Sequence, residues 1–396
     1  MVAQSRVVWD PQFTAYNFGP THPMGPARLD LTARLCADLG LFDGVDLLSP
    51  DVADDDLLAL VHDRDYIAKV KAASADPEHA DQSVGLGTTD DPAFAGMHEA
   101  SARIVSGTVE LCRQVWAGEI EHGVNFCGGL HHAMRDRASG FCIYNDIAVG
   151  IQSLLDAGVE RVAYVDIDVH HGDGVEKIFE TDPRVLTASI HENGRVLFPG
   201  TGWPRDIGTG AAEGCAINVA LPPGTRDSAW LRALTSAIMP VVRAFRPQVL
   251  VTQHGCDTHM MDPLAHMMLT VDAQRQAAML LHDLAHDVCE GKWVALGGGG
   301  YELVEVVPRA WTHLTAIAGH RPIPVAQAVP ESWLQHVEAT FGRLAPARMG
   351  DLDPADADIW VQPWSMGYNP HSEVDRAVMA TREAVFSHWG LDVYFD

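Results

Sequence analysis

The residues best suited to chemistry lie at 166–174, where three carboxylates and two imidazoles follow the apolar run 161–165. That run is short and bounded by polar residues, which predicts a buried parallel strand. Side chains two apart in an extended segment project to one side, so Asp168 and His170 can reach one metal ion, and Asp166 leans the same way. One imidazole with carboxylates suits zinc and neighbouring transition metals. We therefore predict a metal site at the end of this strand.

Three further apolar runs end in residues of the same kind. They are 124–127, followed by glycines with His131 and His132; 248–253, followed by Asp257; and 293–296, followed by four glycines and Tyr301. A histidine pair or a glycine run alone is more often a surface feature or a tight turn. Ligands bind at the carboxyl ends of parallel strands, so four such ends together predict one site.

A metal site built from Asp168, His170 and Asp257 would have three protein ligands. Three ligands leave a position open for water or substrate, which is the arrangement of catalytic rather than structural zinc. A metal ion held in this way lowers the pKa of its water toward ~7 and polarises a substrate carbonyl. These ligands therefore predict hydrolysis of a carbonyl compound.

Hydrolysis also needs a proton carrier and a donor to the developing oxyanion. His131 and His132 can carry the proton, and Asp166 and Asp173 are available to orient the two imidazoles. The phenol of Tyr301, on its glycine hinge, can stabilise the oxyanion. The complete set predicts an amide hydrolase.

Composition limits the class of protein. The 396 residues carry a formal net charge of −26, which argues against nucleic acid as a partner and favours a self-repelling surface over a surface that attracts cationic partners. The seven cysteines are dispersed and form no Cys-x-x-Cys pair, as expected in a reducing cytoplasm. The amino terminus resembles no signal peptide, and no apolar run is long enough to span a membrane. We expect a cytoplasmic protein.

Strand-like and helical runs alternate along the chain. Strands are expected at 6–9, 124–127, 161–167, 185–190, 216–221, 248–253 and 293–296, and helices at 97–116, 146–157, 228–245 and 271–289, with a last helix near 372–389. This alternation predicts a three-layer α/β fold, with a mostly parallel central sheet and helices on both faces. We expect a single domain over 1–396, with a catalytic core at about 7–320 and a tail, 321–396, packed on it.

The motifs resemble those of a known family, the zinc-dependent histone deacetylases of the arginase and deacetylase fold. The matching stretches are 131–132, 139–146, 166–174, 198–202, 253–257 and 297–301, in the family's order and within about 7–320. Residues 16–24 and 257–266 are most similar to the bacterial acetoin-utilisation deacetylases, which are close to class I.

The resemblance implies roles for individual residues. The zinc ligands would be Asp168, His170 and Asp257. His132, paired with Asp173, would be general base and acid, and His131, paired with Asp166, its electrostatic partner. Tyr301 would be the oxyanion donor.

The resemblance also implies a substrate tunnel and cation sites. The tunnel would be formed by Gly140, Phe141 and Phe198, with Leu264 near its mouth. The acid at the rim would be Asp90 or Asp91, because an inserted residue leaves this choice open. One K⁺ or Na⁺ would lie near Asp166, Asp168, His170 and Ser189. A second would lie near Phe179, Asp182 and Val185.

The expected activity is removal of acetyl groups from N-acetyl-lysine in proteins or peptides, with zinc, or alternatively iron, as cofactor. The alternatives are an amidohydrolase of acetylpolyamines or other small molecules, and a non-catalytic protein that binds acyl-lysine. A ureohydrolase of the same fold would need a second metal and more acids. The physiological substrate, the acyl-chain preference and the oligomeric state stay open.

Overall fold

The computed structural model describes residues 3–353, 355 and 358–396, and in them eight strands form one sheet whose neighbours are all parallel. The strands are β1 Ala3–Val8, β2 Leu47–Leu48, β3 Ile120–Asn125, β4 Val162–Asp166, β5 Val185–Glu192, β6 Ala216–Leu221, β7 Val249–Gln253 and β8 Trp293–Leu296. Their order across the sheet is β2-β1-β3-β8-β7-β4-β5-β6. The predicted α/β class is confirmed, with all of these strands parallel rather than most.

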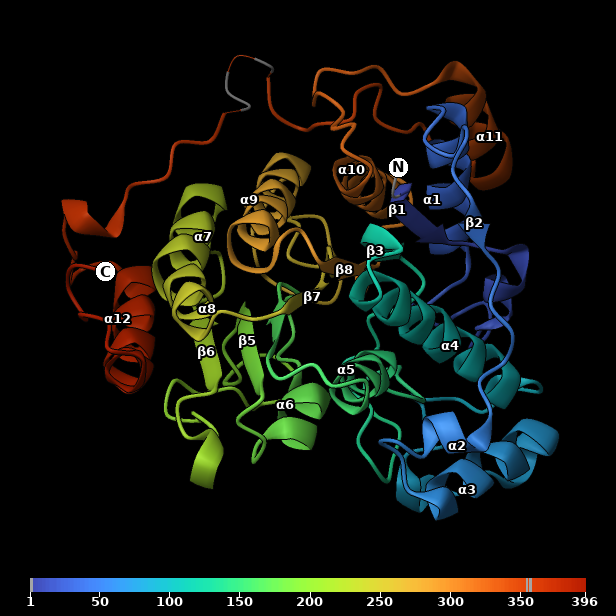
Figure 1. Ribbon diagram of the computed structural model, residues 1–396. Helices are drawn as coiled ribbons and strands as arrows, with labels where there is room; N and C mark the ends of the chain where they lie inside the picture. The colour runs from blue at the N-terminus through green and yellow to red at the C-terminus, as the bar shows by residue number, and fades with distance from the viewer. Residues whose placement is uncertain (1–2, 354, 356–357) are drawn as a thin grey trace.

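Helices cover both faces of this sheet. Those of the described residues are α1 Ala27–Asp38, α2 Asp55–Leu58, α3 Arg64–Ala75, α4 Met97–Trp116, α5 Asp146–Asp156, α6 Asp173–Phe179, α7 Asp227–Ala233, α8 Met239–Phe245, α9 Val271–Cys289, α10 Val307–Ala318, α11 Glu331–Phe341 and α12 Glu373–Val385. In Figure 1, α1 and α7 to α10 lie on one side of the row of strands, and α4 to α6 lie on the other. Within the described ranges, no helix has the length and apolar character needed to cross a membrane.

One predicted helix, 228–245, is interrupted. It consists of α7, a π-helical turn at Leu234–Ile238, and α8, in which Pro240 is the second residue. Proline has no N–H to donate and its ring collides with the carbonyl of the preceding turn, so the helix widens just before it. The spacing of the apolar residues predicted the helix correctly, but this spacing cannot predict the π-helical turn.

The central strands β4, β7 and β8 are buried along their whole length, which explains their continuous apolar sequences. Asp166, the last residue of β4, pairs with Ser189 of β5 on one side and with Gln253 of β7 on the other. Since β3, β8, β7 and β4 are consecutive neighbours, the loops that follow them emerge side by side at one edge. The topology therefore joins the four strand ends singled out in the sequence.

The C-terminal residues lie against two sides of the rest of the chain. Helix α11 packs on α1, and α12 packs on β6 and α7. Arg232 of α7 forms a buried ion pair with Asp375 of α12, with Nε 3.1 Å from Oδ1. The division of residues 1–396 into a catalytic core and a tail stays a prediction, and residues 1–2, 354 and 356–357 lie outside the described part.

Candidate active site

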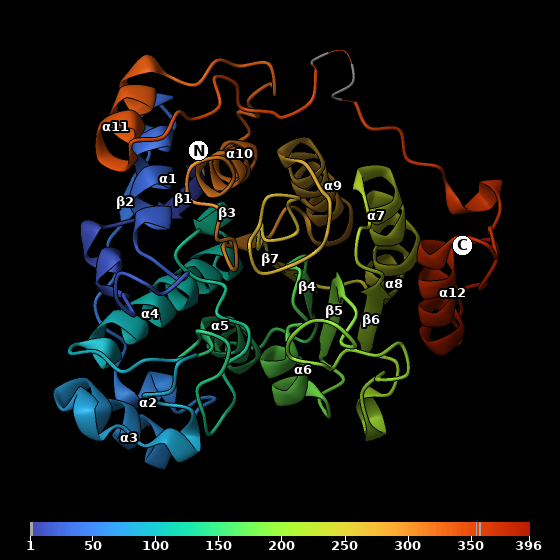
Figure 2. The ribbon, with the colours of Figure 1, turned by 180° about the vertical axis from the view of Figure 1, so that it is seen from behind.

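A narrow cavity opens at the carboxyl edge of the sheet, between the loops that follow β3, β4 and β8. Its lining residues are Met24, Gly129, Leu130, His131, His132, Gly140, Cys142, Asp168, His170, Gly298, Gly299 and Tyr301. Figure 2 shows the molecule from behind, with the loop that follows β7 in front of the strands. Five of the eight residues predicted for catalysis or metal binding line this one cavity.

The three predicted metal ligands converge. Asp168 Oδ1 lies 3.1 Å from His170 Nδ1, and Asp257 Oδ2 lies 3.2 Å from the same nitrogen. All three side chains are buried, and one donor atom of each lies within 4.8 Å of the others. Two oxygens and a nitrogen around one point are a donor set that zinc and related ions accept.

The second oxygen of each carboxylate is fixed by N–H donors. Asp168 Oδ2 accepts from Gln253 Nε2 at 2.7 Å and from the backbone N–H of Gly299 at 2.8 Å. Asp257 Oδ1 accepts from the backbone N–H of Val169 at 2.9 Å. These bonds orient both carboxylates, so that their remaining oxygens point to the shared centre as ligands of a metal ion would.

The two carboxylates differ in acidity. Burial and the adjacent Asp168 carboxylate raise the pKa of Asp257 to about 7. Burial would also raise the pKa of Asp168, but His131 and His170 outweigh it and hold this pKa well below its usual range. Two buried carboxylates this close resist joint ionisation unless a cation lies between them. The residues therefore fit a divalent metal ion.

Both histidines of the pair are oriented by carboxylates. His131 Nδ1–H donates to Asp166 Oδ2 and His132 Nδ1–H to Asp173 Oδ1, each at 2.7 Å. Their Nε2 atoms lie 3.0 Å apart. Burial lowers the pKa of His131, but Asp166 and Asp168 raise it to about 9. Burial and the neighbouring His131 lower the pKa of His132 to about 4, so His132 is the member able to accept a proton.

Tyr301 follows a glycine loop that is held from outside. Arg28 Nη1 donates to the carbonyls of Gly298 and Gly300 at 2.9 and 3.1 Å. A Cβ on Gly299 would collide with the Asp257 carboxylate, so only glycine lets the backbone pass here. Arg28 was not predicted as a functional residue, since no motif surrounds it.

Asp262 connects the backbone of Tyr301 to that of Leu264. Its Oδ2 accepts from the backbone N–H of Tyr301 at 2.8 Å, and its Oδ1 accepts from that of Leu264 at 3.0 Å. Burial raises the pKa of Asp262 to about 6. This carboxylate was also missed, although it lies within the motif stretch 257–266, where its position could have marked it.

Two aromatic rings pack against residues that line the cavity. The ring of Phe141 lies edge-on to that of Tyr301 at 5.8 Å, and Phe141 has a positive φ of 66°. The ring of Phe198 lies edge-on to that of His132, with their centroids 5.0 Å apart, and Phe198 is 45% exposed. A Cβ on Gly140 would collide with His132, so this glycine leaves room for the imidazole. Gly140 and Phe198 therefore lie beside His132, and Phe141 lies beside Tyr301, whereas the tunnel itself stays a prediction.

The structure separates the two candidate rim acids. Asp90 is exposed, and its Oδ2 accepts from the backbone N–H of Gly140 at 2.9 Å. Asp91 is only 1% exposed, and burial followed by repulsion from Asp90 raises its pKa to about 8. Of the two acids, only Asp90 is therefore accessible to a ligand, and its role at the rim stays a prediction.

The residues predicted to hold monovalent cations lie in two places. Asp166, Asp168 and His170 belong to one turn, and Ser189 pairs with Asp166 on the neighbouring strand. Phe179, Asp182 and Val185 belong to the turn between α6 and β5, where Asp182 N donates to Phe179 O at 2.9 Å. Binding of an ion at either place stays a prediction.

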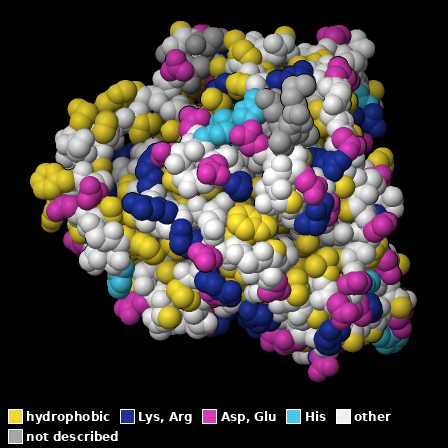
Figure 3. Space-filling model, viewed as in Figure 1, with side chains coloured by type: hydrophobic (Ala, Val, Ile, Leu, Met, Phe, Trp, Pro, Cys, Tyr) yellow, Lys and Arg dark blue, Asp and Glu magenta, His cyan; other side chains and the backbone are white. Residues whose placement is uncertain are grey.

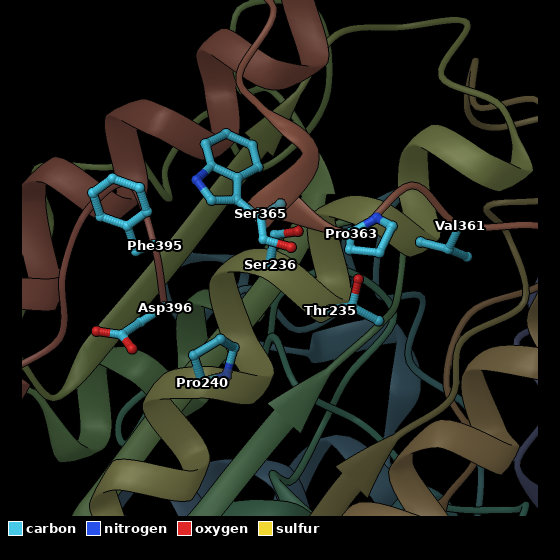
Figure 4. Close-up of a pocket in the computed structure, with 9 residues that line it drawn as sticks. Thr235, Ser236, Pro240, Val361, Pro363, Ser365, Phe395 and Asp396 are labelled. Atoms are coloured by element: carbon cyan, nitrogen blue, oxygen red, sulfur yellow. The ribbon is translucent and has the colours of Figure 1, made fainter.

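A second hollow lies where the C-terminal segment meets the helix that contains the π turn (Figure 4). It is lined by Thr235, Ser236, Pro240, Val361, Pro363, Trp364, Ser365, Phe395 and Asp396. Among these nine residues, Asp396 supplies the only carboxylate side chain, and there is no imidazole or thiol. This lining offers no pair of groups for acid and base chemistry.

The raised pKa of Asp91 predicts how the stability of the protein depends on pH. Its pKa is about 8 in the folded chain, against about 3.9 in an unfolded chain. Unfolding therefore releases a proton between these values, and the wild-type protein loses stability as the pH rises from about 4 to about 8. We expect Asp91→Asn to raise the melting temperature more at pH 9 than at pH 5. An equal change at both values would contradict the assignment.

The sequence of the chain is similar to those of known proteins. Residues 22–318 match the model of the histone deacetylase domain. The chain is 42% identical to the acetoin utilization protein AcuC of Bacillus subtilis, over 88% of this chain and 90% of that protein. It is 39% identical to AcuC of Staphylococcus xylosus, over 83% and 85%. These likenesses support a deacetylase, a hydrolase that acts on an acetylated substrate with the aid of a metal ion. The chain belongs to the histone deacetylase family.

Proposed function

We propose that the protein is a zinc-dependent hydrolase that removes acetyl groups from N-acetyl-lysine side chains of proteins or peptides. The observation that carries the proposal is the convergence, beside one cavity, of the Asp168, His170 and Asp257 donors with two His–Asp pairs and Tyr301. Membership of the histone deacetylase family supports the same reaction class. The pattern matches what amide hydrolysis requires: an electrophile, a base and an oxyanion donor.

Zinc bound by these ligands supplies a Lewis acid for the acetyl carbonyl and lowers the pKa of the attacking water. His132 removes a proton from that water through Nε2, since its Nδ1–H is held by Asp173, and returns it to the departing lysine amine. His131 stays protonated and lends its charge to the developing anion. Tyr301 lines the same cavity as His132. Its phenolic hydrogen can therefore be donated to the oxyanion that forms there.

The entrance supports a long aliphatic substrate. Phe141 packs against Tyr301 and Phe198 against His132, so both rings offer apolar surface near these residues for the methylene stem of a lysine. Asp90 at the rim can accept hydrogen bonds from a peptide backbone. A small-molecule alternative, an acetylpolyamine, is supported by the exposed Asp90 carboxylate, which can attract a cationic substrate.

The test compares turnover of acetyl-lysine peptides and N-acetylpolyamines by the zinc-loaded protein. We expect a higher kcat/KM for the peptides. A higher kcat/KM for the polyamines would show that the substrate is a small molecule rather than a peptide, with the same hydrolytic mechanism. Asp257→Ala should abolish turnover of both and remove one metal ion per chain. Turnover that survives this substitution would refute the metal-dependent mechanism.

The histidine pair should respond unequally. His132→Ala removes the group that transfers the proton, so kcat should fall by about 10²–10⁴ with the metal still bound. His131→Ala removes only a charge and should cost less. Steady-state kinetics with metal analysis on each variant measure both effects. A larger loss at His131 than at His132 would reverse the roles.

Tyr301 separates a catalyst from a protein that only binds acyl-lysine. Its phenol should act on the oxyanion rather than on the bound substrate, so Tyr301→Phe should lower kcat by about 10²–10³ with little change in KM. Turnover and peptide binding are measured on the same preparations. Equal kcat in variant and wild type would remove Tyr301 from the mechanism, and binding without turnover by the wild type would favour the binding protein.

A further inference from the structure

Four histidines gather at the opposite edge of the sheet, where the strands begin. His122 lies in the first half of β3, His282 and His286 are one turn apart on α9, and His320 follows the end of α10. One donor nitrogen of each lies within 4.8 Å of all the others. None of these residues belongs to the deacetylase site or to any motif that predicted it.

The four rings surround a common point. All six distances between ring centroids fall between 4.5 and 5.6 Å. Four imidazoles bound to a tetrahedral zinc ion through nitrogens at about 2.0–2.1 Å have centroids about 5 Å apart. The rings are therefore already spaced as ligands of one ion.

The protonation of two rings is fixed by their partners. His122 Nδ1–H donates to the carbonyl of Ala318 at 2.7 Å, and His282 Nδ1–H donates to Asp283 Oδ1 at 3.1 Å. The Nε2 atom of each ring then carries a lone pair, is buried, and has no hydrogen-bond partner among the described residues. A buried nitrogen left unpaired is destabilising, and coordination to a metal ion would remove this penalty.

Carboxylates stand behind the rings. Glu121 Oε2 lies 3.3 Å from His320 Nε2, and Glu121 Oε1 lies 3.7 Å from His286 Nδ1. Together with Asp283 behind His282, these groups orient the imidazoles and carry two negative charges that balance a divalent cation.

We propose that His122, His282, His286 and His320 form a second metal site, which binds one zinc ion in a closed tetrahedral shell. Four protein ligands leave no position for substrate, so the ion is structural. It would join β3, α9 and the end of α10 at the point where the C-terminal segment begins. Binding draws the donors inward, which the partly exposed side chains of His286 and His320 allow.

An ion can reach this site from solvent. Figure 3 shows histidine side chains gathered on the surface between α9 and α10, with acidic side chains at their border. His286 and His320 have side-chain exposures of 35% and 28%, against 15% for His282. The two exposed ligands are also the ones that can be replaced with the least effect on packing.

The test counts zinc ions per chain after dialysis against zinc and then against metal-free buffer. We expect two ions in the wild type, one in Asp257→Ala, one in the double variant His286→Gln/His320→Gln, and none in the triple variant. The control, His79→Gln/His371→Gln, replaces two exposed histidines outside the cluster and should keep two.

The design separates this site from the active site. If Asp257→Ala binds no ion, or if the triple variant still binds one, the four-histidine site is refuted. If the wild type binds one ion and the double variant none, the four-histidine site is supported and the proposed active-site metal is refuted. Cobalt in Asp257→Ala should give the strong visible absorption of a tetrahedral site, and His286→Gln/His320→Gln should remove it.

The double variant should change the stability of the protein but not its activity. We expect its kcat/KM on an acetyl-lysine peptide to stay within about twofold of wild type, because the cluster lies at the opposite edge of the sheet. Added zinc should raise the melting temperature of the double variant less than that of the wild type, because only the active site can still bind an ion, and it should not raise that of the triple variant. A zinc-dependent rise in the double variant equal to that in the wild type would contradict the assignment.

Discussion

The structure depends on burying three carboxylates, Asp166, Asp168 and Asp257, at the carboxyl edge of a parallel sheet. An unpaired buried charge costs more than most single packing contacts return, so each must be compensated where it stands. Asp166 accepts from Tyr164 and His131, and Asp168 from Gln253 and the Gly299 backbone. The parallel register makes this possible, since it places Gln253 beside Asp166 at the end of β4.

The same constraint explains why the glycine loop after β8 is held so firmly. Its backbone must approach the Asp168 carboxylate closely enough to donate a hydrogen bond, and a side chain at Gly299 would prevent that approach. Arg28 and Asp262 then anchor the loop from opposite ends, through the Gly298 carbonyl and the Tyr301 N–H. Tyr301 is thus positioned by backbone contacts, which leaves its phenol available for the proposed role as oxyanion donor.

Sequence reasoning was sufficient for the groups that stand directly at strand ends. Helices α4 and α9 were predicted to the residue, and Asp168, His170 and Asp257 converge as expected. It failed for contacts between distant segments: Arg28 reaches Gly298 across 270 positions, and no local pattern reports such a contact. The four histidines escaped for the same reason, because only packing brings α9 and the end of α10 to His122. The choice between Asp90 and Asp91 likewise needed burial, which their adjacent positions do not reveal.

The two edges of the sheet present opposite donor chemistry. At the carboxyl edge, two carboxylates and one imidazole leave the coordination of an ion incomplete, and the surrounding His–Asp pairs can use the open position for catalysis. At the amino edge, four imidazoles complete the shell, and the carboxylates stand behind them rather than at the ion. Neutral imidazoles add no negative charge at the centre, so the charge of the ion would be balanced by Glu121 and Asp283 behind the rings, and no position would be open for a substrate. The ion would therefore act only by joining β3, α9 and the end of α10, next to the start of the C-terminal segment.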